Sequence, residues 1–490
     1  MRPRPIFESP AAERANLGRL LLIAYNFPPD QEIGALRWQK LARHAAERGW
    51  MVDVVTRDPA ELESRDETRL ADLPAGTRIY GVPFRPLLIE RLEVAVWRAL
   101  RPHLRGRARE AATRGAASVT RKGISWRDRP WKHLLRANHV LLHYGAFHRW
   151  ARHAADLAVR LYEPGLHRAV ISTGPPHMAH ESGRRVAHAT QVPFIMDMRD
   201  PWSMSHRLGE QMASPIWFTL AEYFQDRAVA QAALIVANTE SLRLLLLHRY
   251  PEAQERLITV MNGSDEELLP QSQLRERFVA AFAGDIYIDR DPRPLFRGAA
   301  RAVRDLDLSP EQFGISLLGT VEQYAGASVR DIAREEGIDA FVTLLPRRTR
   351  GQALEFLAGA AMLVSLPQDS DMTIPSKIFE YAQFNAWLLA LARPDSATEL
   401  VLRGSGADVI DPDDVEGLAA ILKQRYQQFR SGVRPTAIGA DGRFSRRVQA
   451  QRLLDAIHRC CTGLAPLSTA PAIPSGGRDA GPAKSSTIRR

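Results

Sequence analysis

Short apolar runs alternate with helical patterns along most of the chain. The first run extends from Arg19 to Tyr25, and a helical spacing of apolar residues between Gly34 and Gly49 leads to a second run, Trp50 to Thr56. Apolar runs of this length are typical of strands that are covered on both faces of a sheet. The succession of strand, helix and strand therefore predicts a parallel βαβ unit.

The same alternation continues and then begins again in a second half. In the first half, further strands are expected at 78–82, 169–172, 194–197, 234–237 and 257–260. After the polar sequence Asn262-Gly263-Ser264-Asp265, strands are expected at 278–282, 314–318, 341–344, 361–366 and 387–392. Both halves are thus predicted to be α/β domains with doubly wound parallel sheets, which bind ligands outside the carboxyl ends of their strands.

Changes in composition set the expected domain limits. Residues 1–17, rich in Pro, Arg and Ala, and residues 463–490, rich in Pro, Gly and Ser, are predicted to be disordered tails. The first domain is expected at 18–268, the second at 269–435, and a last helical segment at 436–462. Residues 84–139 are harder to interpret and are assigned to a basic insert in the first domain.

The basic charge of the chain is concentrated in one stretch. The formal net charge is +10 and the pI is about 9.9, and residues 101–150 contain twelve Lys or Arg against two acids. Trp97, Trp126 and Trp131 lie among these basic residues, a composition typical of a segment at a membrane interface. Residues 84–150 are therefore a candidate contact with an anionic membrane surface. A solvated basic face is the alternative, and nucleic acid is not an expected partner because no fold for it is recognisable.

The cysteine pattern and the hydropathy bear on location. The chain has two cysteines, the neighbours Cys460 and Cys461, and adjacent cysteines rarely form a bridge without strain. We therefore expect a protein of a reducing compartment, the cytoplasm. No apolar run approaches the ~20 residues that span a bilayer, so any membrane contact is expected to be peripheral, at the inner face. Because the spacing typical of zinc ligands is also absent, no metal site is expected.

The most informative stretch is Ile374-Pro375-Ser376-Lys377-Ile378-Phe379-Glu380-Tyr381. It follows the apolar run 361–366, and Lys377 and Glu380 share one face of a helix that Ser376 is expected to cap. A strand, a polar loop and a helix N-terminus together form a natural place to hold phosphate and ribose. The pattern favours a nucleotide-sugar site, and a solvated ion pair between Lys377 and Glu380 is the alternative.

Several further motifs follow one another in a fixed order. On the N-terminal side they are Phe27-Pro28-Pro29 with Gly34 and Arg37, Pro175-Pro176 with His180, Asp197-Met198-Arg199-Asp200-Pro201-Trp202, and Asn262-Gly263-Ser264-Asp265. On the C-terminal side they are Lys377 with Glu380, Gly404 with Gly406, and Phe444-Ser445-Arg446-Arg447. Over about residues 18–460, this series resembles the retaining GT-B glycosyltransferases of the family 4 type.

The resemblance implies a GT-B fold, in which two Rossmann-like doubly wound α/β domains face each other across a cleft. Residues 18–268 would be the acceptor domain and 269–435 the nucleotide-sugar domain, with the helix in 436–462 crossing back to the first. The reaction implied is transfer of a sugar from a nucleoside diphosphate sugar, carrying UDP or GDP, with retention of configuration. No metal or other cofactor would be needed, because cations and helix N-termini neutralise the departing diphosphate.

The resemblance also assigns roles to residues. On the donor side, Gly34 would let backbone N–H groups approach the diphosphate, Arg290 and Lys377 would stabilise it, and Glu380 would accept hydrogen bonds from the ribose. Two departures concern this side. Asp285 follows Gly284 where the family carries an arginine, and Met372 replaces the first of two glutamates. Either the neighbouring Asp371 is the sugar contact instead, or the donor differs, or activity is weakened.

On the acceptor side, His180 is the candidate catalytic residue near the reacting carbon, with His177 as a competitor for the same role. Arg199 and Asp200 are placed beside the acceptor, with a structural ion pair as the other interpretation. The predicted function is sugar transfer to a glycan or a lipid-linked acceptor, in surface polysaccharide or related glycoconjugate biosynthesis. Two alternatives are a nucleotide-sugar epimerase, whose flanking carboxylates cannot be located, and a degenerate, non-catalytic scaffold or partner subunit, which Met372 and Asp285 favour.

Overall fold

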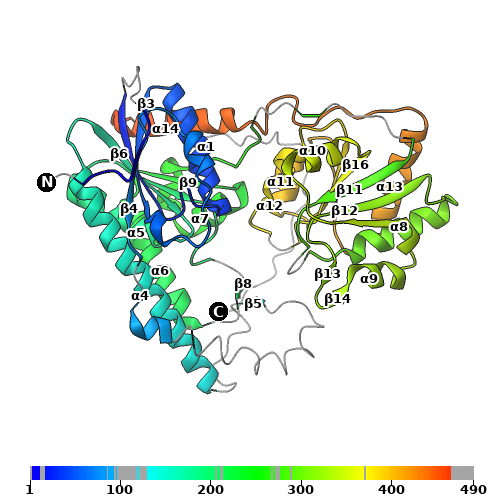
Figure 1. Cartoon of the computed structure of the whole chain (residues 1–490), viewed down its shortest axis with the longest axis horizontal. Coiled ribbons are helices and arrows are strands. Elements are labelled where there is room, and N and C mark those ends of the chain that lie inside the picture. Colours follow the sequence, from blue (N-terminus) through cyan, green and yellow to red (C-terminus); the bar gives the residue numbers. More distant parts are fainter. Residues whose placement is uncertain are drawn as a thin grey trace.

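The chain forms two α/β domains, each built around a parallel sheet (Figure 1). The computed structural model describes residues 3–10, 17–84, 87–92, 95, 118–120, 130–204, 207–209, 212, 214–265, 269–270, 276–286, 290–368 and 371–464. Trp97 and Trp126, most of the basic insert and residues 465–490 lie outside these ranges, so the predictions made for them are not addressed by the structure.

The first domain contains an eight-stranded sheet in the order β1-β4-β3-β2-β6-β7-β9-β10, in which only β1 is antiparallel to its neighbour. The strands are β1 (Phe7–Glu8), β2 (Gly18–Ala24), β3 (Trp50–Arg57), β4 (Arg78–Val82), β6 (His167–Gly174), β7 (Phe194–Met198), β9 (Leu234–Ala237) and β10 (Leu257–Thr259). The central strands are buried on both faces, as their continuous apolar sequences predict.

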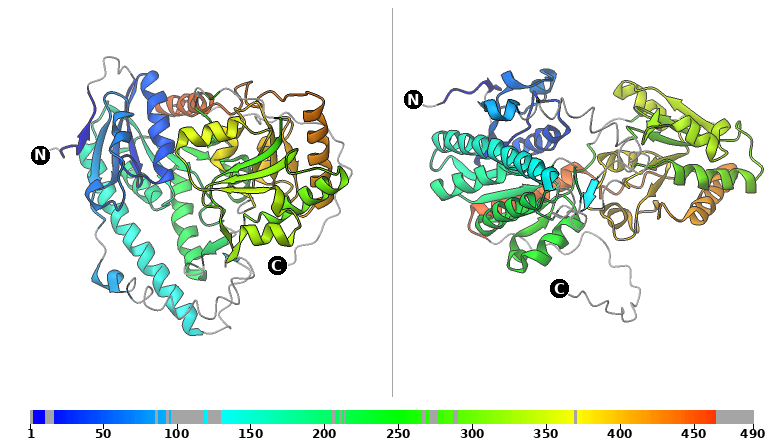
Figure 2. Two further views of the ribbon diagram at one scale, coloured as in Figure 1. Left: turned by 45° about the vertical axis from the view of Figure 1, so that its right-hand side comes forward. Right: turned by 90° about the horizontal axis from the view of Figure 1, so that it is seen from below.

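Alternate residues of each strand enter two different cores. Leu21 and Ile23 of β2 face a core formed with α4 (Pro130–Leu161), α5 (Ala179–Thr190) and α6 (Pro215–Gln231), which lie side by side in Figure 2. Leu20 and Leu22 face the opposite core, which includes α1 (Ile33–Glu47). Two further helices of this domain are the short α2 (Thr68–Ala71) and α7 (Glu240–Arg249).

The second domain contains a six-stranded sheet in the order β15-β12-β11-β16-β17-β18, parallel throughout. Its strands are β11 (Phe278–Ala283), β12 (Phe313–Leu318), β15 (Val342–Leu345), β16 (Met362–Ser365), β17 (Trp387–Leu391) and β18 (Asp408–Ile410). Its helices are α8 (Arg293–Asp305), α9 (Val329–Glu335), α10 (Arg350–Ala358), α11 (Ser376–Tyr381), α12 (Ala397–Leu402) and α13 (Val415–Arg430). Two small antiparallel pairs join β5 (Ser118–Thr120) to β8 (Arg207–Gly209) and β13 (Gln323–Tyr324) to β14 (Ala327–Ser328).

The last helix, α14 (Arg446–Cys461), returns to the first domain (orange-red in Figure 1) and buries Leu453 and Ile457 in the core that contains α1. The polar sequence after β10 holds the returning chain. The Ser264 N–H donates to the Phe444 carbonyl oxygen over 2.8 Å, and the Arg446 side chain donates to the Asp265 carboxylate over 2.7 Å. A Cβ on Gly263 would lie 2.6 Å from the Arg446 backbone, so this crossing requires glycine.

The predicted fold class is confirmed, since both halves are Rossmann-like α/β domains, but three local predictions were wrong. Phe7 and Glu8, assigned to a disordered tail, pair with β4, because backbone bonds and the Ser9 hydroxyl, which donates to the Pro74 carbonyl over 2.8 Å, fix a segment with no apolar pattern. Helix α4 begins at Pro130, far before the expected start near 148. Ser376 is the first helical residue of α11, not its cap. Among the described residues, no helix has the length and apolar character needed to cross a membrane.

Candidate functional site

The predicted acceptor-side residues meet around Gly174, the last residue of β6. The Arg199 N–H and its Nε both donate to the Gly174 carbonyl oxygen, over 3.0 and 3.2 Å. The same guanidinium donates to the carbonyl oxygens of Gly34, over 2.7 Å, and of Pro175. A Cβ on Gly34 would lie 2.6 Å from Arg199 Nη1, so the glycine makes room for this arginine. Arg199 thus ties the first turn of α1 to the ends of β6 and β7.

Asp200 does not form a direct ion pair with Arg199 in the structure. Burial raises the pKa of the Asp200 carboxyl above its ordinary value, although the charge of Arg199 partly opposes this. Burial also lowers the pKa of Arg199, despite the nearby carboxylates of Asp197 and Asp200. The charged forms of both groups are therefore destabilised by their partial removal from water. Backbone carbonyls, and not Asp200, hold the Arg199 guanidinium.

His180 and His177 lie together under the same loop, but only His177 is partly exposed. His180 is 0% exposed, and its Nδ1 lies 2.8 Å from the Ser172 hydroxyl, while its Nε2 faces Gly174 with no hydrogen-bond partner among the described residues. The His177 ring stacks on Trp202, with centroids 5.2 Å apart. Burial, assisted by the charge of Arg199, lowers the pKa of His180 to about 3, and burial lowers that of His177 well below its ordinary value. Both imidazoles are neutral at pH 7.

A buried ionic network beneath this group was missed by sequence reasoning. Asp197 is 0% exposed and accepts hydrogen bonds from Arg37 Nη2 over 2.9 Å, from Trp38 Nε1 over 2.8 Å and from the Thr173 hydroxyl over 2.9 Å. Burial disfavours the charged carboxylate, but the charge and hydrogen bonds of Arg37 outweigh it and keep the pKa of Asp197 below its ordinary value. Arg37 also donates to the Asn262 side chain and to the Val260 carbonyl, over 3.0 and 2.9 Å. The network fixes α1 against the carboxyl ends of β6, β7 and β10.

Two of the predicted donor-side residues, Lys377 and Arg290, lie at the carboxyl end of β11 in the second domain, whereas Gly34 does not. Lys377, on α11, donates to the Ala283 carbonyl oxygen over 2.9 Å, and its ammonium lies 4.2 Å from the centre of the Phe282 ring. Arg290 also approaches this strand end, with its Nη1 3.5 Å from the Asp285 carbonyl oxygen. The structure thus brings Lys377 and Arg290 to the same corner, which lies on a different domain from Gly34, His180 and Arg199.

Two glycines keep this corner open. Gly284 has a φ of +144°, and a Cβ there would lie 2.1 Å from Lys377 Nζ. Gly319, at the end of β12, has a φ of +132°, and its Cβ would lie 2.1 Å from the Gly284 carbonyl oxygen. L-residues rarely adopt such φ values, so both positions require glycine. The Tyr381 hydroxyl contacts the same strand end, where it accepts a hydrogen bond from the Ala283 N–H over 2.9 Å.

The two carboxylates of the corner are each paired with an arginine, one from the loop between β15 and α10 and one from the first position of α10. Arg347 donates to both oxygens of Asp285, over 3.1 and 3.0 Å, and Arg350 forms an ion pair of 2.9 Å with Glu380. Burial tends to raise the pKa of Asp285, but hydrogen bonds from Thr320 and Arg347 outweigh it and lower this pKa. The negative charge of Asp285 is therefore compensated. The basic run Pro346-Arg347-Arg348-Thr349-Arg350, directly after a strand, is the signal in the sequence that could have indicated these partners.

Asp371 and Met372 lie where the two domains touch. The side chain of Asp371 is exposed, and its carbonyl oxygen accepts from the Ala397 N–H over 2.7 Å at the start of α12. The Met372 carbonyl oxygen accepts from the Thr239 hydroxyl of the first domain over 2.8 Å. Thr239 also caps α7. The segment that departs from the family pattern is thus held by its backbone at a contact between domains. No group of three or more His, Cys, Asp or Glu that could hold a metal occurs among the residues that the structure describes.

Comparisons with known proteins give the fold a name. Sucrose-phosphate synthase from Thermosynechococcus elongatus superposes with a TM-score of 0.51 at 12% identity, over 90% of this chain and 96% of its own. A glycosyltransferase from Rickettsia africae gives 0.54 at 9% identity, over 91% and 99%. Anabaena Alr3699/HepE, solved in complex with UDP-glucose, gives 0.51 at 13% identity, over 89% and 98%.

These likenesses define the architecture as the GT-B fold, with two Rossmann-like domains, which is the fold of the glycosyltransferases named above. No family model and no curated protein sequence matches the chain. Because the identities are near 10%, the likeness establishes the fold alone, and the chemistry must be argued from the site.

Proposed function

We propose that this protein is a retaining glycosyltransferase that moves a sugar from a nucleoside diphosphate sugar, with UDP or GDP as the leaving group, to a glycan or lipid-linked acceptor. The observation that carries the proposal is the corner at the end of β11. There an ammonium, Lys377, lies beside two glycines with positive φ, and Glu380 projects from the same short helix. Such a corner leaves the backbone accessible to a diphosphate and supplies a cation to neutralise it.

The roles follow from the charges. Lys377 and Arg290 bind the diphosphate and stabilise its charge as the bond to the sugar breaks. Glu380 exchanges its partner Arg350 for the ribose hydroxyls, and Asp371 contacts the sugar. Gly34 allows the backbone N–H groups in the first turn of α1 to approach the diphosphate of the donor. No cofactor is required for these steps, because the protein's own cations offset the charge on the leaving group.

On the first domain, the acceptor lies near Arg199, Asp200 and the two histidines. The partly exposed His177 is better placed than His180 to touch an acceptor in this conformation, and His180 supports its ring from below, with centroids 5.8 Å apart. Retention is proposed from the family resemblance, and its test is the anomeric configuration of the product by NMR.

We further propose that the protein works at the cytoplasmic face of a membrane in surface polysaccharide or related glycoconjugate biosynthesis. Two unbridged cysteines suit a reducing compartment. Leu87, Leu88, Ile89 and Leu92 are 48–77% exposed beside the basic insert, and such a surface suits contact with anionic lipid through residues 84–150.

A non-catalytic scaffold is the second candidate, favoured by Asp285 and Met372. Nucleotide binding separates the two. Thermal unfolding should be followed with UDP, GDP and ADP, and a nucleotide at 100 times its Kd should stabilise the protein by roughly 2.7 kcal/mol, a shift of several degrees. The variant Lys377→Ala should lose the shift. The variant Lys423→Ala, which removes a partly exposed lysine of α13 that is paired with Asp305 of α8, should keep it. If no nucleotide shifts the wild type, the scaffold becomes the better proposal.

A further inference from the structure

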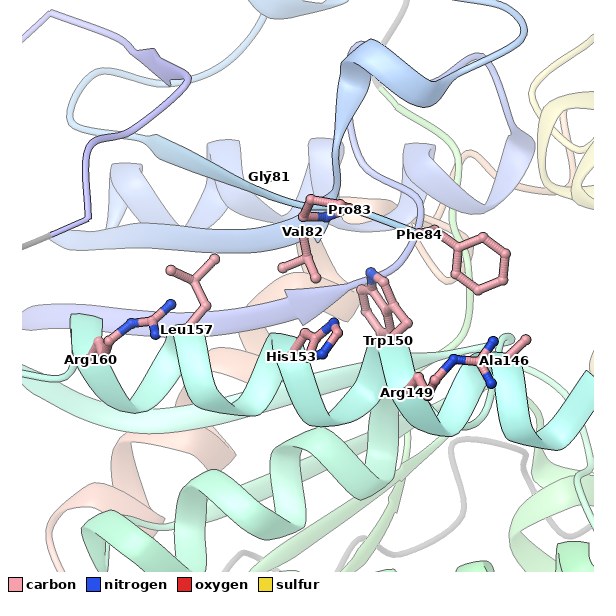
Figure 3. A pocket seen from close by; sticks show the side chains of 10 residues that line it. All are labelled: Gly81, Val82, Pro83, Phe84, Ala146, Arg149, Trp150, His153, Leu157 and Arg160. Carbon is pink, nitrogen blue, oxygen red and sulfur yellow. The ribbon is translucent and has the colours of Figure 1, made fainter. Parts of the chain in front are cut away.

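A groove of about 400 Å³ lies between β4 and helix α4, on the first domain and away from the donor corner (Figure 3). Its wall on α4 extends from Ala146 to Arg160, which at ~1.5 Å per residue gives a length of about 21 Å. Val82 and Phe84 form the opposite wall, at the edge of the sheet. This volume is within the usual range for small-molecule sites, and the groove is long and narrow.

A buried donor in the groove has no partner. Trp150 is 1% exposed, and its Nε1–H makes no hydrogen bond among the described residues. Its ring is held by an edge-to-face contact with Tyr25, at 4.9 Å between centroids. Figure 3 shows the indole nitrogen directed across the groove toward β4. Since buried donors in native proteins are almost always paired, this N–H points to a ligand that brings an acceptor atom.

Basic and apolar groups alternate along the same helix face. His153 follows Trp150 by three residues, Leu157 follows by seven and Arg160 by ten, so helical periodicity aligns them along one side of the groove. Val82, Phe84 and Leu157 supply apolar walls, while His153 and Arg160 are exposed at the rim. The lining therefore suits a ligand with an apolar body and a negative group.

One end of the groove is continuous with an exposed apolar surface. Glu90 accepts two hydrogen bonds from Arg149, over 2.5 and 2.6 Å, and so attaches the segment 87–92 to the groove wall. On this segment, Leu88 is 77% and Leu92 65% exposed. Leucines so exposed beside a groove suit a lipid surface from which a chain could enter.

We propose that this groove binds the hydrocarbon chain of a single-chain anionic lipid whose phosphate or carboxylate accepts hydrogen bonds from Trp150 Nε1 and His153. The length of the hydrocarbon chain is inferred from the 21 Å groove, and the negative head group from the Arg160 guanidinium and the N–H donors of Trp150 and His153. The inference goes beyond the proposed sugar transfer, because it depends on no residue of the donor corner.

The test is isothermal titration calorimetry of the full chain with dodecyl phosphate and dodecanoate, each below its micelle concentration, and with dodecanol and inorganic phosphate as the separate halves of the ligand. We expect one or both amphiphiles to bind and each half to bind at least about ten-fold more weakly. Which amphiphile binds more tightly identifies phosphate or carboxylate as the head group.

Variants locate the site. Trp150→Phe keeps an aromatic side chain but removes the indole N–H, and should weaken binding about ten-fold. His153→Ala and Arg160→Ala, both at exposed positions, should weaken it several-fold without endangering the fold. Arg152→Ala removes an exposed arginine of the same helix that does not line the groove, and should leave the Kd unchanged.

Three results would overturn the proposal: no binding of either amphiphile, equal binding of dodecanol, or equal effects of Arg160→Ala and Arg152→Ala. A nucleotide-induced thermal shift measured on the same preparations reports on the donor corner separately. Failure of the groove and failure of sugar transfer are thus distinguishable.

Discussion

Removal of the Asp197 carboxylate tests whether the first domain depends on its buried ionic network. Asp197 is fully buried, and Arg37, its partner, is 4% exposed. In the variant Asp197→Ala, the guanidinium stays buried without its counter-charge, and the Trp38 and Thr173 donors lose their acceptor. Breaking a buried pair by removal of one partner typically costs 3–5 kcal/mol. We expect a loss of about 4 kcal/mol in the free energy of unfolding of the first domain.

The assay is urea denaturation of the full chain, followed by tryptophan fluorescence, with the two domains fitted as separate transitions where they separate. The matched control is Asp455→Ala on α14, which breaks an exposed ion pair with Arg48 in the same domain. Exposed pairs contribute about 0.2–1 kcal/mol, so this control should change little.

A second variant separates the cost of an orphaned charge from the net contribution of the pair. Arg37→Met combined with Asp197→Leu removes both charges and should be less destabilising than Asp197→Ala alone, because no unpaired ion remains in the core. A loss below about 1 kcal/mol for Asp197→Ala would refute the argument, since the carboxylate would then be replaceable by water. A double variant worse than the single would show that geometry, not charge, dominates.

Three further predictions concern the strand ends. Gly284→Ala should abolish the nucleotide-induced thermal shift, because its Cβ would lie 2.1 Å from Lys377 Nζ; an unchanged shift would place the nucleotide elsewhere. Arg347→Ala leaves the Asp285 carboxylate without its arginine, so the Kd for the nucleoside diphosphate, measured by calorimetry, should rise several-fold. Because salt screens the repulsion between Asp285 and the diphosphate, the Kd of this variant should increase less with salt concentration than the Kd of the wild type. Burial lowers the pKa of His180 in the native chain to about 3, whereas a histidine in the unfolded chain has a pKa of about 6.5. Between these two pH values the unfolded chain therefore binds a proton that the native chain does not bind. Stability should therefore fall as pH falls below about 6.5, by up to ~1.4 kcal/mol per pH unit, and His180→Gln should flatten this slope in urea titrations at pH 7 and pH 5.

Much of the fold was predictable because the strands carry unbroken apolar sequences. Arg78–Val82 and Leu234–Ala237 have the predicted bounds, and the other strands that were predicted differ by a residue or two at their ends. The short strand β18 (Asp408–Ile410) was not predicted. Helix α4 was cut short in the prediction because only its C-terminal half packs fully on the sheet. Leu134 and Leu141 in the N-terminal half are 67% and 52% exposed, which removes the periodic signal of burial.

The places of Lys377 and Glu380 in the fold were predictable, but the groups that they contact were not. Lys377 and Glu380 lie on a helix after β16, as their spacing indicated, yet the groups they bind, Ala283 and Arg350, come from other elements. Such contacts depend on strand order: β11 and β16 are neighbours although their paired residues, Ala280 and Met362, are 82 positions apart in the sequence. Arg37 and Asp197 are 160 residues apart for the same reason. A local pattern carries no information about which strand ends meet.

The charges at the strand ends of the two domains differ in a way that supports a division of labour. In the first domain, Arg37 donates hydrogen bonds to Asp197, and Arg199 donates its own to three backbone carbonyls. His177 and His180 are neutral at pH 7. In the second domain the cations of Lys377 and Arg350 lie near the surface with partners that a ligand can replace. A diphosphate needs exchangeable cations, whereas the hydroxyls of a glycan need neutral donors and acceptors. The proposed transfer, from a nucleoside diphosphate sugar on the second domain to a glycan on the first, requires this same asymmetry.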